Sequence, residues 1–139
     1  MARSTGVKAN ICKSATMTKP VLLIGHHHPG TIELASNFAD QNGFRPCIEM
    51  DGRNFTRAYT DNPPTLILYE FFTDHFDGIE LVRWLVDGEN TARVVMTAAS
   101  NLNVTGAAIA MAEQTDLFAL TVLPSGASDE TLLTALATG

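Results

Sequence analysis

Residues 64–81 read PTLILYEFFTDHFDGIEL and contain a sharp change of pattern. The segment from Thr65 to Glu70 is apolar between its two ends, which is typical of a strand covered on both faces of a parallel sheet. From Asp77 to Val86 the apolar residues recur at helical spacing, and Asp77 can cap the helix that they predict. The stretch therefore predicts a strand followed by a helix, which is one βα unit.

The same alternation repeats on both sides of this unit. The predicted strands are Val21–Gly25, Pro46–Glu49, Thr65–Glu70, Arg93–Thr97 and Leu117–Val122, and the predicted helices are Thr31–Gln41, Arg53–Thr60, Asp77–Val86, Val104–Gln114 and Ser128–Ala137. Five such units predict an α/β fold of the flavodoxin-like kind, a doubly wound five-stranded parallel sheet. Ligands of that fold bind at the carboxyl ends of the strands, so a functional site is expected after Gly25, Glu70, Thr97 and Val122.

Charge divides the chain into two parts. Residues 1–19 hold four of the nine lysines and arginines and none of the 15 acidic residues, whereas residues 20–139 have a formal net charge of −10 and no lysine. We therefore predict a basic flexible tail at 1–19 and one folded domain at 20–139. Nucleic-acid binding depends on cationic side chains that neutralise phosphates, so the acidic domain is not expected to bind DNA or RNA.

Two further features bear on the compartment. The apolar runs, such as Val21 to Ile24 and Leu66 to Tyr69, are far shorter than the roughly 20 residues that cross a bilayer. The first 19 residues lack the apolar stretch of a secretory signal. We therefore expect a cytoplasmic protein without membrane contact, in which Cys12 and Cys47 are reduced.

The four histidines, His26, His27, His28 and His75, all follow the first or the third predicted strand. Glu70 and Asp74 lie in the same loops, and imidazoles with a carboxylate are suitable ligands for Zn²⁺. The favoured interpretation is that they are solvated loop histidines, because consecutive residues point in different directions. A metal site formed by His26, His27, His75 and Glu70, or a pH-sensing role of the imidazoles, stays open as an alternative.

The 64–81 stretch resembles the central strand and following helix of response-regulator receiver domains, which are CheY-like. In that family a phosphoacceptor Asp ends the strand and an Asp-Gly or similar pair begins the helix seven residues later; Glu70 and the Asp77-Gly78 pair keep this spacing. The resemblance extends over residues 20–137. It includes VLLIGHHHP at 21–29, VVMTA at 94–98 and VLP at 122–124.

The resemblance also identifies departures at the site. It places His26 and His27 where family members have an acidic pair for Mg²⁺, Glu70 where they have the phosphoacceptor Asp, and Leu123 where they have a Lys. Only the switch hydroxyl, Thr97, is kept. Since imidazoles are poor ligands for Mg²⁺ and Leu123 supplies no charge, these residues form a degenerate phosphoacceptor pocket with no catalytic residue and no cofactor.

The resemblance therefore implies a pseudo-receiver in two-component signal transduction that acts by protein contact and needs no phosphorylation. Its partner, a second protein or a second copy in a homodimer, would bind the helix at 104–114, the strand at 117–122 and the helix at 128–137. A metal- or ligand-sensing module that uses the histidines is the first alternative. A small enzyme is the least favoured reading, because no nucleophile, base and orienting group stand together in the sequence.

Overall fold

A computed structural model describes residues 19–71, 75–98 and 102–138, with the side chains of 102–105 not described. Strands and helices alternate along the chain. The strands are β1 (Val21–Gly25), β2 (Arg45–Ile48), β3 (Leu66–Glu70), β4 (Arg93–Ala98) and β5 (Leu120–Pro124); the helices are α1 (Pro29–Gln41), α2 (Gly52–Asp61), α3 (Gly78–Asp87), α4 (Leu102–Glu113) and α5 (Asp129–Ala137). All strand pairs are parallel, in the order β2-β1-β3-β4-β5. This is the flavodoxin-like, doubly wound sheet that the sequence predicts.

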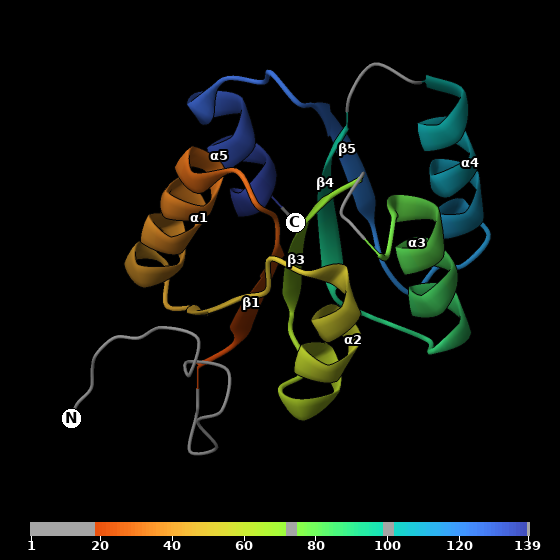
Figure 1. The fold of residues 1–139 in the computed structure, drawn as a ribbon, viewed down its shortest axis with the longest axis horizontal. Coiled ribbons are helices and arrows are strands. Elements are labelled where there is room, and N and C mark those ends of the chain that lie inside the picture. Colours follow the sequence, from red (N-terminus) through yellow and green to blue (C-terminus); the bar gives the residue numbers. More distant parts are fainter. Residues whose placement is uncertain (1–18, 72–74, 99–101, 139) are drawn as a thin grey trace.

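Helices cover both faces of the sheet, with α1 and α5 on one side and α3 and α4 on the other (Figure 1). Side chains alternate between the faces along each strand. In β3, Ile67 and Tyr69 join the core beneath α2, α3 and α4, whereas Leu66 and Leu68 join the core beneath α1 and α5. Glu70 therefore emerges on the α1/α5 face, at the carboxyl edge of the sheet.

The connection from β3 to α3 shows why Asp77 and Gly78 stand together in residues 64–81. Asp77 accepts a hydrogen bond from the Glu80 backbone N–H, and Glu80 accepts one from the Asp77 N–H, so the two form a capping box. A Cβ at Gly78 would overlap the ring of buried Phe71. The pair therefore begins the helix and lets it approach the end of β3 closely.

The last strand begins later than the sequence predicts. Residues expected to form a strand at 117–122 pair with β4 only from Leu120, which lies opposite Val94. Before it, the Thr115 hydroxyl accepts a hydrogen bond from the Leu117 N–H and Leu117 is exposed. The residues 117–119 are thus loop rather than strand, because a side-chain hydrogen bond turns the chain there.

Cys47 in β2 is buried and disulfide-bonded, so the expectation of a reduced thiol at this position is wrong. A sequence does not reveal which sulfur atoms come within bonding distance, and a disulfide depends on that distance. None of the described helices is long and apolar enough to cross a membrane.

Candidate functional site

Three predicted site residues form one row at the carboxyl edge of the sheet. Glu70 at the end of β3 lies opposite Thr97 in β4, and Thr97 lies opposite Leu123 in β5. The strand alternation puts this row on the α1/α5 face, where Leu123 is partly buried against the core. The fold thus gathers residues that are 27 and 26 positions apart in the chain.

His26 follows β1 and is directed into the same row. Its side chain is 5% exposed, and its Nε2 atom lies 2.9 Å from the Oγ1 atom of Thr97. Its Nδ1 atom accepts a hydrogen bond from the His28 N–H at 3.3 Å. Since Nδ1 is an acceptor, the neutral ring carries its proton on Nε2, which donates to Thr97. Burial lowers the pKa of His26 from its ordinary value of 6.5, and the nearby Glu70 carboxylate opposes this only in part.

His27 takes a different direction and meets Glu70. The Nδ1 atom of His27 lies 2.5 Å from Glu70 Oε1, whereas the Nδ1 atom of His26 lies 3.8 Å from the same oxygen. The His27 side chain is 62% exposed and that of Glu70 is 23% exposed. Solvent screens a pair of this kind, so it contributes little to stability, but it occupies the carboxylate that ends β3.

His28 is the N-cap of α1. Its Nδ1 atom accepts the Thr31 N–H and lies 3.2 Å from the Thr31 hydroxyl. The imidazole of His28 thus accepts the backbone hydrogen bond that a Ser, Asp or Asn side chain accepts at most helix N-termini. The three consecutive histidines thus have three separate partners: a strand hydroxyl, a carboxylate and a helix end.

His75 lies apart from this group. Its backbone has φ 72°, in the left-handed region, and its Nδ1 atom lies 3.3 Å from Asp51 Oδ1. Asp51 caps α2 and binds the Arg53 guanidinium at 2.7 Å. The hydrogen bonds from Arg53 hold the pKa of Asp51 well below its usual range. The contact of His75 is therefore with the β2–α2 loop.

Several receiver domains have solved structures that resemble this fold. The receiver domain of Francisella response regulator 1452 has a TM-score of 0.67 at 16% identity, covering 84% of this chain and 93% of that one. The signal receiver domain of an HD domain-containing protein from Pseudomonas fluorescens Pf-5 has a TM-score of 0.71 at 14% identity, covering 85% and 91%. This chain has the receiver fold.

A two-component AraC transcriptional regulator from Clostridium phytofermentans also matches, with a TM-score of 0.67 at 19% identity over 86% of this chain and 90% of that one. No protein-family model and no curated protein matches the sequence. At these identities the likeness concerns the fold alone. What the receiver fold does in this chain depends on the residues at its carboxyl edge.

The receiver-fold edge of this chain does not fit Mg²⁺. That ion prefers oxygen ligands in octahedral geometry, but His26 and His27 present nitrogen atoms, and the carboxylate that ends β3, Glu70, contacts His27. Within the described ranges no group of three or more His, Cys, Asp or Glu side chains could hold a metal ion. Asp74, which the sequence analysis grouped with the histidines, lies outside the described residues.

Sequence reasoning missed two residues of the receiver-fold edge, Asp51 and Arg53. The available signal was Asp51-Gly52 after an apolar run, a typical helix start like the Asp77-Gly78 pair. The sequence also led us to expect His75 beside the other histidines, because loops that follow neighbouring strands of a sheet lie next to each other. His75 instead contacts Asp51 in the β2–α2 loop.

Proposed function

We propose that this chain is a regulatory receiver-like domain of two-component signalling that works without phosphorylation and catalyses no reaction. It would act by contact with a protein partner. The observation that carries the proposal is the bond between His26 and Thr97, which joins the ends of β1 and β4 through a neutral imidazole. The receiver fold of the solved relatives supports the signalling class.

The chemistry of phosphoryl transfer supports the absence of phosphorylation. That reaction needs a metal ion and fixed cations to neutralise charge on the phosphoryl oxygens. The row that contains Glu70, Thr97 and Leu123 supplies neither, because the adjoining His26 is buried with a lowered pKa and Leu123 is apolar. Arg53, a cation elsewhere at this edge, is paired with Asp51. Glu70 also carries its carboxylate one methylene further from the backbone than an Asp does, which changes the geometry of attack. We therefore treat His26, His27, Glu70, Thr97 and Leu123 as a degenerate phosphoacceptor pocket.

The proposed contact surface consists of α4, β5 and α5. β5 is the last strand of the sheet, and none of its five residues is buried. On α4, Gly106, Ala107 and Ala110 are exposed, and small side chains allow another backbone to approach closely. A protein partner or a second copy of the chain could cover β5, because no described strand pairs with its outer side.

The alternative of a metal sensor gains no support from the observed contacts. His26 and His27 both approach Glu70 Oε1, but His28 caps α1 and His75 contacts Asp51, so the four imidazoles do not meet at one point. Among the described residues no three candidate ligands come together.

Phosphorylation is the test of the proposal. The intact mass of the protein after incubation with acetyl phosphate and Mg²⁺ should not increase. An adduct of one phosphate on Glu70 would contradict it.

A further inference from the structure

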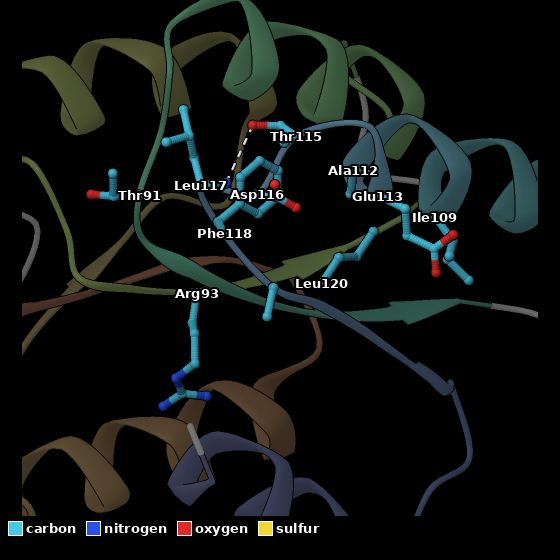
Figure 2. A pocket seen from close by; sticks show the side chains of 11 residues that line it. Thr91, Arg93, Ile109, Ala112, Glu113, Thr115, Asp116, Leu117, Phe118 and Leu120 are labelled. Atoms are coloured by element: carbon cyan, nitrogen blue, oxygen red, sulfur yellow. Dashed lines mark hydrogen bonds between the residues drawn. The ribbon is translucent and has the colours of Figure 1, made fainter.

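A groove lies at the amino ends of β4 and β5, whereas Glu70 lies at the carboxyl ends of the strands. The groove has a volume of about 610 Å³ and is bounded by the end of α4, the loop that follows it and the first residues of β4 and β5. Figure 2 shows its lining side chains, which include Ile109, Glu113, Asp116, Leu117 and Leu120. The groove opens at the amino ends of the strands, so no residue of the degenerate phosphoacceptor pocket lines it.

Among the described residues that line it, the groove carries negative charge that no cation offsets. Glu113 and Asp116 are both exposed. Glu113 is the last residue of α4, whose final turn contains no basic residue, so the partial negative charge of the helix end adds to the carboxylates. Arg93 is the one arginine of the lining, but its guanidinium donates to the carbonyls of Ala135 and Leu136 in α5 and points away from the other lining side chains (Figure 2).

Apolar surface lies beside these charges. Leu117 is 44% exposed, and the Thr115 hydroxyl fixes its position by accepting its N–H. Ile109, Phe118 and Leu120 are each partly buried along the same wall. An exposed leucine held in place beside two carboxylates is complementary to a segment that carries both apolar and cationic side chains.

We propose that this groove binds a cationic amphipathic segment of a partner protein. An apolar side chain of the segment covers Leu117 and Leu120, and its lysines or arginines face Glu113 and Asp116. The inference rests on the proposed function, because the groove belongs to the proposed contact surface of α4 and β5. It adds which kind of partner segment would bind there. Apolar burial supplies most of the affinity, while the charges accelerate association and make it sensitive to salt.

The probe is a fluorescein-labelled helical peptide of leucine and lysine, titrated with the whole protein and followed by fluorescence anisotropy. A peptide with glutamate in place of lysine serves as the probe control. Two variants test the groove: the single substitution Leu117→Ser, and the double variant Glu113→Gln/Asp116→Asn. The matched control is the double variant Glu33→Gln/Asp40→Asn, which removes the same charge from exposed positions of α1.

Leu117→Ser should weaken binding about tenfold, equivalent to about 1.4 kcal/mol. The double variant Glu113→Gln/Asp116→Asn should lower the association rate of the peptide and make that rate less dependent on salt. The double variant in α1 should change neither. Absence of binding, or equal losses in the groove and α1 double variants, would overturn the proposal. So would self-association by sedimentation that Leu117→Ser abolishes, since a second copy would then occupy the groove. A phosphate adduct on Glu70 would refute the proposed function but leave this titration interpretable, because the two sites lie at opposite ends of the strands.

Discussion

The Nε2 atom of His26 and the Oγ1 atom of Thr97 lie 2.9 Å apart, although 71 residues separate them in the chain. The bond spans from the end of β1 to β4, across the strand that carries Glu70. Both side chains are buried, so each polar atom needs its partner. The contact thus joins the ends of β1 and β4 across β3, at the carboxyl ends of the strands.

Stability should fall as the pH drops below about 6.5, the ordinary pKa of histidine. Burial lowers the pKa of His26 in the folded state, so the unfolded chain binds the proton first and is favoured as the pH falls. The groups facing His26 are Glu70, which opposes the shift, and His27 and His28, which add to it. Urea unfolding between pH 5 and 8 should show a smaller loss for His26→Gln than for the native chain. Identical pH profiles would show that His26 is not the responsible group.

Thr97→Val should reduce the free energy of unfolding by about 1–3 kcal/mol, because it leaves the buried Nε2–H of His26 without an acceptor. Thr97→Ser keeps the hydroxyl and should cost less. Urea unfolding at pH 7.5 measures both. A Ser variant as unstable as the Val variant would mean that the methyl group, rather than the hydrogen bond, matters at this position.

His28→Ala should cost about 1 kcal/mol by removing the N-cap of α1, whereas His28→Asn should keep most of the stability. The comparison of the two variants by thermal unfolding separates capping from other losses. If Ala and Asn were equivalent, the contact between His28 and Thr31 would have no energetic role.

Leu123→Lys should not restore phosphorylation, since the positions of His26 and His27 would still lack oxygen ligands for Mg²⁺. The variant should fold, because Leu123 is only partly buried and a lysine stem can cover similar apolar surface. Intact mass after phosphodonor treatment, with circular dichroism to confirm folding, checks this. Phosphorylation of the single variant would refute the argument about the metal ligands.

The sequence predicted the sheet well because its strands are short apolar runs, and because α3 begins with a recognisable cap. Asp77 was expected as an N-cap, and its side chain accepts the Glu80 N–H. The start of β5 was predicted too early, since Leu117 is apolar but lies in a turn that the Thr115 hydroxyl makes. Apolar character alone does not distinguish an exposed loop leucine from a strand residue.

The site was predicted less completely than the fold. Register brings Glu70, Thr97 and Leu123 into one row, as the order of the strands implies. The directions of the histidines could not be predicted, because adjacent loop residues have no fixed periodicity. The bond of His26 to Thr97 and the contact of His75 with Asp51 depend on backbone angles that composition does not specify.

The most direct test of the central claim is the intact mass of the protein after incubation with acetyl phosphate and Mg²⁺, beside a receiver domain known to accept phosphate from the same donor. The account predicts an unchanged mass for this chain while the reference protein gains one phosphate. An acid-labile gain of one phosphate that Glu70→Gln abolishes would contradict it.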